Sequence, residues 1–251
     1  MNTLVSVILP NYNEIENLER GVLQDIAAYF AKEPYGWEVV ISDDGSTDKS
    51  LEYIEKFIET NPGFRLIKNK HAGKPFALRS GVKVARGKYA LLTDMDQSTP
   101  IDQLDKLLPY TKDGYNVVIG SRGIRRRDSS LLRQFASVVF LLARKIFLLR
   151  GIKDTQCGFK LFETGLANKI FAQMRIFGRS SSATGWKVTA YDVEMLFLSE
   201  MLGEEIQEVR VVWRDEDTSS GKKRNFIKES VEMFLEILRV RINYTLGKYN
   251  V

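Results

Sequence analysis

Two aspartates one residue apart, Asp94 and Asp96, follow an apolar run and could bind a metal ion together. Carboxylate oxygens are the ligands that Mg²⁺ and Mn²⁺ prefer, and such a cation would neutralise a diphosphate leaving group. The same pair could instead form a turn in which Asp96 caps a helix. Because the chain has one cysteine and one histidine, soft ligands are scarce, and Mg²⁺ or Mn²⁺ is the cofactor we expect.

A second acidic cluster, residues 43–48, reads Asp-Asp-Gly-Ser-Thr-Asp. A carboxylate in this cluster could accept hydrogen bonds from a base N–H or from ribose hydroxyls. These residue types also suit a tight turn followed by a helix cap. We therefore assign capping to Thr47 or Asp48 and the binding role to Asp43 and Asp44.

Both clusters follow apolar runs that predict buried strands, and helical spacing fills the segments between the strands. We predict strands at 4–9, 37–42, 64–68, 89–93, 116–119 and 203–213, and helices at 14–32, 48–59, 74–85, 101–108 and 226–244. The alternation in the first half predicts a parallel sheet covered by helices on both faces. Ligands bind at the carboxyl ends of such strands, so we expect residues 11–14, 43–48 and 94–96 at one edge.

The segment 131–149 is strongly apolar and has basic residues near its ends. It could be a core helix, an oligomer interface, or a helix that lies in a membrane surface among anionic headgroups. Lys222, Lys223 and Arg224 would extend such a surface. The uncharged run 134–143 is about half of the roughly 20 residues that a spanning helix needs, so we expect a chain that does not cross a membrane.

The overall composition indicates a soluble globular protein, with 44% hydrophobic and 27% charged residues among 251. The formal net charge of +5 favours anionic partners such as phosphates or anionic lipid. We expect no nucleic-acid partner, because the sequence lacks a basic stripe interleaved with aromatic residues and lacks a known nucleic-acid motif.

Several motifs together resemble the signatures of inverting family 2 glycosyltransferases. The general signatures are Val7–Glu14 (VILPNYNE), Ser42–Asp48 (SDDGSTD) and Asp94–Asp96 (DMD), in the order and spacing of that family. Segments similar to polyprenyl-phosphate sugar synthases are 73–81 and 120–122, and segments similar to the dolichyl-phosphate glucosyltransferase branch are 154–162, 191–194 and 212–213.

The resemblance implies an α/β Rossmann-like fold, the GT-A fold, with a mostly parallel central sheet, helices on both faces and a C-terminal amphipathic helix. Residues 1–215 would form the glycosyltransferase domain, and residues 216–251 a loop and a C-terminal helix that we expect at a membrane. The hydrophobic membrane segments of many relatives are missing, which leaves the mode of attachment open.

The family pattern also implies which residues meet the nucleotide-sugar donor. The nucleoside pocket would be lined by Pro10, Tyr12, Glu14 and Asp43. The residues expected beside the rest of the donor are Asp44, Lys74, Asp94 and Asp96, of which the last two would meet the ribose, the metal and the diphosphate.

The acceptor decides which further side chains the chemistry needs. A lipid phosphate is an anion at neutral pH and attacks without a base, whereas a sugar hydroxyl needs a base, for which Asp192 is the best candidate. A phosphate acceptor instead needs cations that bring two anions together, and the candidates are Arg122, Lys160, Arg125, Arg126 and Arg127. The alternatives are a structural hydrogen bond for Asp192 and a solvated loop for the last three arginines.

We therefore expect an enzyme that transfers a hexose, glucose from UDP-glucose, to a polyprenyl or dolichyl phosphate. It would be peripheral on the cytoplasmic face of a membrane, and it could form a homo-oligomer. Two alternatives stay open: a family 2 enzyme with a sugar hydroxyl as acceptor, and a non-catalytic module that binds a nucleotide sugar or a membrane. The presence of both Asp94 and Asp96 argues against the module, which has no need of metal chemistry.

Overall fold

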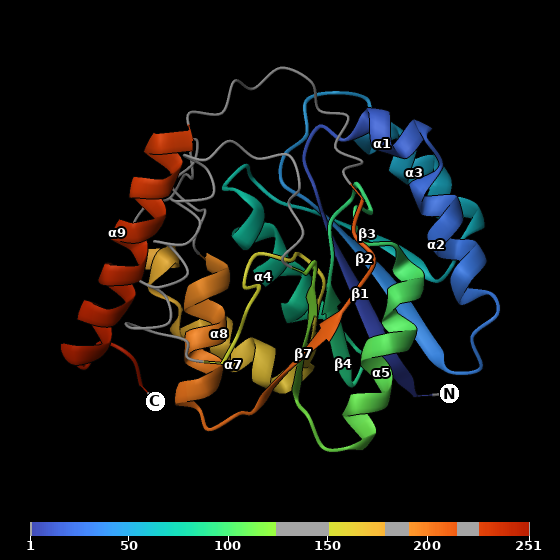
Figure 1. Cartoon of the computed structure of the whole chain (residues 1–251). Helices are drawn as coiled ribbons and strands as arrows, with labels where there is room; N and C mark the ends of the chain where they lie inside the picture. The colour runs from blue at the N-terminus through green and yellow to red at the C-terminus, as the bar shows by residue number, and fades with distance from the viewer. Residues whose placement is uncertain (1, 124–150, 179–190, 215–225, 251) are drawn as a thin grey trace.

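The computed structural model describes residues 2–123, 151–178, 191–214 and 226–250, and these are arranged around a seven-stranded sheet (Figure 1). The strands are β1 (Thr3–Asn11), β2 (Gly36–Asp43), β3 (Phe64–Lys68), β4 (Tyr89–Leu92), β5 (Val117–Ser121), β6 (Lys160–Glu163) and β7 (Ile206–Arg210). Their order in the sheet is β3-β2-β1-β4-β6-β5-β7. The predictions that fall outside the described residues concern the helix at 131–149, Arg125, Arg126, Arg127 and the basic residues 222–224.

All strands except β6 run in the same direction. The mostly parallel sheet predicted from the alternation of strands and helices is thereby confirmed. The antiparallel strand β6 was not predicted, because its pairing with β4 and β5 joins segments that are distant in the sequence. It begins where its neighbours end, with Lys160 opposite Leu92 of β4. This reversal brings Lys160 to the carboxyl edge of the sheet.

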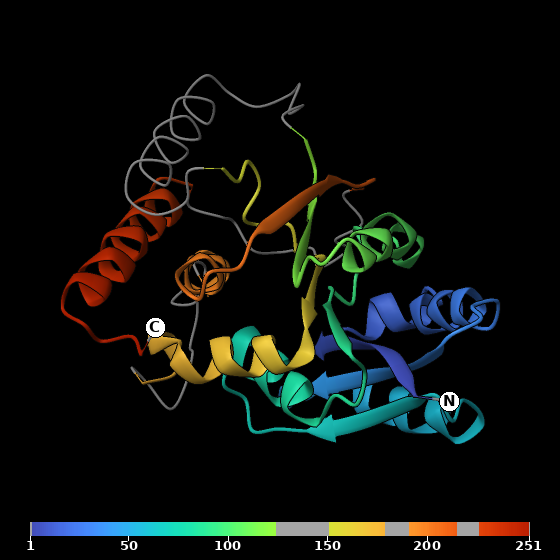
Figure 2. The same ribbon diagram turned by 90° about the horizontal axis from the view of Figure 1, so that it is seen from below.

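Helices cover both faces of the sheet, as predicted (Figure 2). Alternate residues of a strand point to opposite faces, so Val7 and Leu9 of β1 pack in one hydrophobic layer and Ile8 in the other. The first layer includes residues of α1 (Ile15–Glu19), α2 (Val22–Phe30), α3 (Ser50–Thr60) and α5 (Leu104–Lys112). The second includes residues of α4 (Lys74–Val84), α7 (Thr164–Gln173), α8 (Tyr191–Met201) and α9 (Phe226–Thr245). Two short 3₁₀ turns complete the order, η1 (Ile101–Gln103) and η2 (Arg175–Gly178).

Three local expectations need correction. The helix predicted over 14–32 is divided into α1 and α2 at Gly21, whose φ of 94° belongs to the left-handed region that glycine tolerates. The helix cap predicted at Thr47 or Asp48 falls at Lys49, although the Asp48 carboxylate still accepts a hydrogen bond of 2.9 Å from the Ser50 N–H. The strand predicted at 203–213 is confined to β7.

The longest described helix, α9, lies at the outside of the second layer and packs on α8. Ile237 and Val240 are buried, whereas Leu235 and Ile242 are about half exposed, at 51% and 53%. Among the helices in the described ranges, none combines the length and the apolar character that crossing a bilayer requires.

Candidate active site

The carboxyl ends of β1, β2 and β3 lie next to one another at one edge of the sheet. In the strand register Asn11 is opposite Asp43, and Asp43 is opposite Lys68. β4 lies on the other side of β1, so Asp94 and Asp96 follow at the same edge. The structure thus gathers the polar clusters that are far apart in the sequence, at the place where parallel sheets bind ligands.

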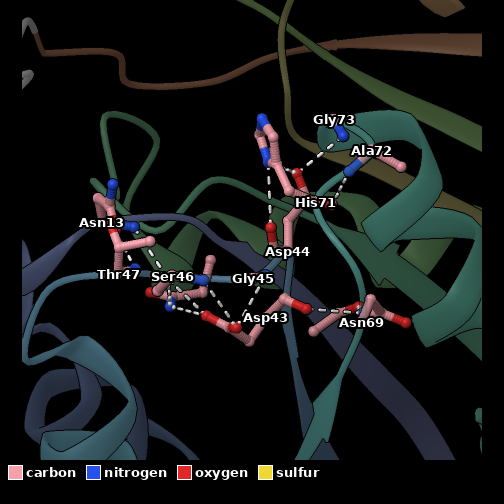
Figure 3. A network of polar contacts seen from close by, with 12 residues as sticks. Asn13, Asp43, Asp44, Gly45, Ser46, Thr47, Asn69, His71, Ala72 and Gly73 are labelled. Atoms are coloured by element: carbon pink, nitrogen blue, oxygen red, sulfur yellow. Dashed lines mark hydrogen bonds and ion pairs between the residues drawn. The ribbon is translucent and has the colours of Figure 1, made fainter. Parts of the chain in front are cut away.

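The carboxylate of Asp43 is engaged by its own turn (Figure 3). Its Oδ2 accepts hydrogen bonds from the backbone N–H groups of Gly45 (2.9 Å) and Ser46 (3.0 Å). Its Oδ1 accepts a bond of 2.7 Å from Asn11 Nδ2. Asp43 is buried, so both of its oxygens serve to shape the turn that follows β2.

The neighbouring Asp44 fastens the end of β2 to the loop that follows β3. Its two carboxylate oxygens accept hydrogen bonds from the backbone N–H groups of Ala72 (2.9 Å) and Gly73 (2.8 Å). His71 Nδ1 lies 2.9 Å from the Asp44 Oδ2 atom. The anchored loop runs directly into α4, whose first residue is Lys74. Asp44 therefore helps to fix where Lys74 stands.

Lys74 forms an ion pair with Asp94, across the edge of the sheet. Burial alone would raise the pKa of Asp94, but the Lys74 ammonium outweighs it and holds this pKa below the usual range. Burial likewise opposes the charge of Lys74, yet Asp94 keeps the lysine pKa above its ordinary value. The Asp94 carboxylate is packed against Gly158, where an added Cβ would lie 2.2 Å from Asp94 Oδ2.

The negative charge of Asp96 is compensated less well than that of Asp94, which has Lys74 as a partner. Asp96 Oδ1 accepts a hydrogen bond of 2.8 Å from the Ser98 N–H, and the Asp96 backbone carbonyl accepts one of 2.5 Å from Arg20. Burial, and then the negative charge of Asp94, raise the pKa of Asp96. Two carboxylates that repel each other in this way fit a hard divalent cation, which would relieve their repulsion.

No third acidic, histidine or cysteine side chain joins these two carboxylates within the described ranges of the chain. A cation held by Asp94 and Asp96 would therefore take its other ligands from water or from a bound diphosphate. Magnesium sites in nucleotide-dependent enzymes commonly combine one or two carboxylates with substrate phosphates.

Lys160 and Asp192 form a buried ion pair whose lysine acts electrostatically on Asp94. The distance from Lys160 Nζ to Asp192 Oδ1 is 2.6 Å, and the Lys160 side chain is 1% exposed. The same ammonium also donates to the backbone carbonyl of Cys157. Burial, and then the charge of Asp192, raise the pKa of the adjacent Tyr191. The pair joins β6 to the start of α8, and the Lys160 charge helps to lower the pKa of Asp94.

Arg122 follows β5 and is gripped by Asp154 in a bidentate ion pair. The two bonds, from Nε and Nη2, measure 2.8 and 2.9 Å. Burial opposes the charge of Arg122, but its bonds to Asp154 raise the guanidinium pKa. The guanidinium also lies 5.7 Å from the centre of the Trp213 ring, which is 41% exposed. Asp154 thus orients a cation that the sequence had suggested as a phosphate ligand.

Tyr12, predicted to line the nucleoside pocket, has an unexpected partner in His71. The two rings are stacked with centroids 4.2 Å apart and planes 20° apart. Pro10 is the penultimate residue of β1, and Glu14 follows the strand. The Glu14 N–H donates a hydrogen bond of 2.9 Å to the Ser50 hydroxyl. Sequence reasoning did not identify His71 as a site residue. Its position just after β3 could have done so, because the residues after the neighbouring strands β1 and β2 were already candidates.

Comparison with known families gives a consistent picture. The family model described as Glycosyl transferase family 2 matches residues 6–171. The chain is 33% identical to the dolichyl-phosphate beta-glucosyltransferase of Dictyostelium discoideum, over 100% of this chain and 77% of that protein. It is also 33% identical to the dolichyl-phosphate beta-glucosyltransferase of Saccharomyces cerevisiae, over 98% of this chain and 76% of that protein.

Solved structures share the fold at low sequence identity. Mannosyl-3-phosphoglycerate synthase from Rubrobacter xylanophilus is 17% identical, with a TM-score of 0.67 over 99% of this chain and 76% of that one. Glucosyl-3-phosphoglycerate synthase from Mycobacterium tuberculosis, in complex with Mn²⁺, UDP and its product, is 16% identical with a TM-score of 0.59, over 99% and 81% of the two chains. These similarities establish the architecture of the sheet and its helices.

Proposed function

The chain belongs to glycosyl transferase family 2, and from this premise we propose that it transfers glucose from UDP-glucose to dolichyl or polyprenyl phosphate. The proposal is supported by two relatives that carry the name dolichyl-phosphate beta-glucosyltransferase and align with nearly the whole chain. The structural observation that carries it is the site at the sheet edge. There two aspartates, Asp94 and Asp96, lie among cations that can neutralise phosphate groups.

We assign the donor diphosphate to the region beside Lys74 and the two aspartates. A divalent cation bound by Asp94 and Asp96, Mg²⁺ or Mn²⁺, would neutralise the charge that develops on the leaving diphosphate. The Mn²⁺ and UDP named with the mycobacterial structure support this choice. Lys74 is then the side chain that holds Asp94 in place before the donor arrives.

The state of Asp192 favours a phosphate acceptor over a hydroxyl. A general base must reach the proton that it removes, and a carboxylate paired with a buried ammonium is poorly suited to that task. A phosphate acceptor needs no base. Its anionic oxygens need a cation instead. Among the described residues we assign this role to Arg122, because Asp154 holds its guanidinium in a fixed orientation.

We assign Lys160 and Asp192 to positioning. Their buried pair links β6, which pairs with β4, to α8. Lys160 would act on the donor site through its positive charge on Asp94 and would not touch the acceptor itself. Pro10, Tyr12 and Glu14 remain assigned to the nucleoside, with Asp43 and Asp44 shaping the turn and the loop around it.

We also propose that the protein attaches to the cytoplasmic face of a membrane. Leu235, Ile242 and Leu246 follow one another at spacings of seven and four residues, which places them on one side of the α9 direction. All three are more than half exposed, and burying a large apolar side chain is worth about 1.5–3 kcal/mol. An apolar side of this kind would suit reversible attachment where the lipid acceptor resides.

A transfer assay tests the proposed function. The protein is incubated with UDP-glucose labelled in the sugar, dolichyl phosphate in detergent, and Mn²⁺. We expect label in the organic phase, lost with chelator and lost in Asp96→Ala. Label that enters only water-soluble products would indicate a hydroxyl acceptor. Tight UDP binding without transfer to any acceptor would indicate a non-catalytic module.

A further inference from the structure

The stacked pair of Tyr12 and His71 is built from strands that flank β2. Tyr12 follows β1 and His71 follows β3, and between these two strands lies β2, which ends at Asp43 just before Asp44. The two rings thus meet where the carboxyl ends of three strands converge. Each ring is about two-fifths exposed, so an aromatic surface remains open beside the turn.

His71 is held in a fixed orientation by Asp44. Its Nδ1 lies 2.9 Å from Asp44 Oδ2 and 3.1 Å from the Asp44 carbonyl oxygen. Asp44 is 2% exposed, and its carboxylate is itself held by the N–H groups of Ala72 and Gly73. A Cβ at Gly45 would lie 2.9 Å from the His71 backbone nitrogen, so the two turns are packed closely together. Asp44 therefore holds the imidazole through Nδ1 and restricts rotation of the His71 side chain.

This anchoring decides which ring nitrogen of neutral His71 carries the proton. The carboxylate and the carbonyl of Asp44 are acceptors only, so Nδ1 must be the donor. Nε2 then has a lone pair and acts as an acceptor. Figure 3 shows the imidazole standing above Asp44, with one nitrogen turned toward Asp44 and the other directed away from it.

We propose that His71 is a specificity-determining residue for the donor nucleobase, with Nε2 accepting the ring N–H of uracil. The inference rests on the proposed UDP-glucose donor and names the feature of the base that is read. Uracil presents a ring N–H at N3, whereas cytosine presents a lone pair at the same position. An acceptor facing an acceptor leaves both groups without a partner, which strongly disfavours the wrong ligand.

The test measures binding of UDP and CDP, each with Mn²⁺, by titration calorimetry. Two variants separate the ring from its nitrogen. His71→Ala removes both, and His71→Phe keeps a ring to stack on Tyr12 but has no nitrogen. Pyrophosphate with Mn²⁺ serves as a base-free probe of the metal and diphosphate region.

We expect the wild type to prefer UDP over CDP, and both variants to lose about tenfold of that preference, as befits one hydrogen bond in a partly buried site. Pyrophosphate binding should stay unchanged in both. If His71→Phe keeps the wild-type ratio of UDP to CDP affinity, the ring acts by stacking alone and the inference is wrong. An unchanged ratio in His71→Ala, or a wild type that binds UDP and CDP equally, overturns it as well.

These outcomes are distinct from a failure of the proposed function. The transfer assay can fail in a protein that still distinguishes UDP from CDP through His71, and the base preference can be insensitive to His71 in a protein that transfers glucose normally.

Discussion

Lys160 and Asp192 lie 2.6 Å apart in a part of the molecule from which water is almost excluded, 32 residues apart in the sequence. A carboxylate in this position stabilises a buried ammonium, and it is this relationship that separates a positioning role for Asp192 from a general base. Removing one partner of a buried pair leaves an uncompensated charge, at a typical loss of about 3–5 kcal/mol.

We predict that Asp192→Asn lowers stability by about 3 kcal/mol or more and retains transfer to dolichyl phosphate within about tenfold per folded molecule. Lys160→Met together with Asp192→Asn should be less destabilising than the sum of the single changes, since the double variant has no orphaned charge. Denaturant unfolding and steady-state rates measure both effects. A rate loss on the order of 10²–10⁴-fold in a well-folded Asp192→Asn would instead assign it as a base.

The second prediction concerns Asp96. Asp96→Asn removes the repulsion with Asp94, so the metal-free protein should gain about 0.5–1 kcal/mol of stability. The same change should weaken Mn²⁺-dependent binding of UDP by about 100-fold or more. Thermal unfolding in chelator and calorimetry with UDP and Mn²⁺ provide the two measurements. A variant that is destabilised without metal, or that binds UDP and Mn²⁺ normally, contradicts the role that we assign to this carboxylate.

The raised pKa of Asp96 predicts that cation binding releases protons. A raised pKa means that the folded, metal-free protein holds this proton more tightly than the unfolded chain. Its contribution to folding is therefore present at low pH and lost as the pH rises through the folded value. Asp94, with a lowered pKa, contributes in the opposite sense. Its contribution is present above the ordinary carboxyl value and lost as the pH falls through the folded one.

We therefore expect the affinity for Mn²⁺ with UDP to fall on the acid side of neutrality, starting above the ordinary aspartate value of about 3.9. Calorimetry of Mn²⁺ binding without nucleotide, on the acid side of neutrality in two buffers of different ionisation enthalpy, should give different heats, because a proton leaves Asp96 when the cation binds. Titrations at pH 8 are the control and should agree between buffers. Equal heats at both pH values would argue that Asp96 is already ionised.

Gly158 gives a purely steric prediction. An alanine Cβ there would lie 2.2 Å from Asp94 Oδ2, so Gly158→Ala must displace that carboxylate. A displacement near 1 Å can cost about 100-fold in rate. Gly151→Ala is the matched control, because a Cβ at Gly151 meets no atom within 4 Å. If both alanine variants turn over UDP-glucose equally well, Asp94 is not required in its present position.

The last prediction concerns the acceptor. Arg122→Lys keeps a positive charge but cannot reproduce the two bonds to Asp154, so the cation loses its fixed orientation. We expect the KM for dolichyl phosphate to rise about tenfold, because a change of that size corresponds to the loss of one hydrogen bond to a charged group. Binding of UDP with Mn²⁺ should change little. A variant that loses UDP affinity instead would move Arg122 to the donor side of the reaction.

Much of this arrangement follows from local patterns. β3 has the predicted bounds and α4 begins at the predicted Lys74, because a short apolar run and a helical period are each contained within a few residues. The parallel alternation then places Asp94 and Asp43 at one edge without knowledge of any contact. What local patterns do not contain is pairing between distant segments.

The antiparallel strand β6, the Arg122–Asp154 pair and the Tyr12–His71 stack all depend on such pairing. Lys160 was identified as a useful cation and Asp192 as a useful carboxylate, but no periodicity reveals that each is the other's partner. Likewise, a single histidine in a polar loop has no pattern of its own. The contacts of His71 with Asp44 and Tyr12 become visible only when β3 is paired with β2 in the structure.

The anchoring of the loop after β3 by Asp44 has a consequence for the order of events during turnover. The residues that we propose to meet the base continue directly into Lys74, so one short segment would contact both the base and the region of the diphosphate. Energy gained when the base docks can be used to set the groups around the diphosphate. A donor that lacks uridine, glucose 1-diphosphate, would then react slowly even at saturation, because it makes no contact with the base-binding end of this segment.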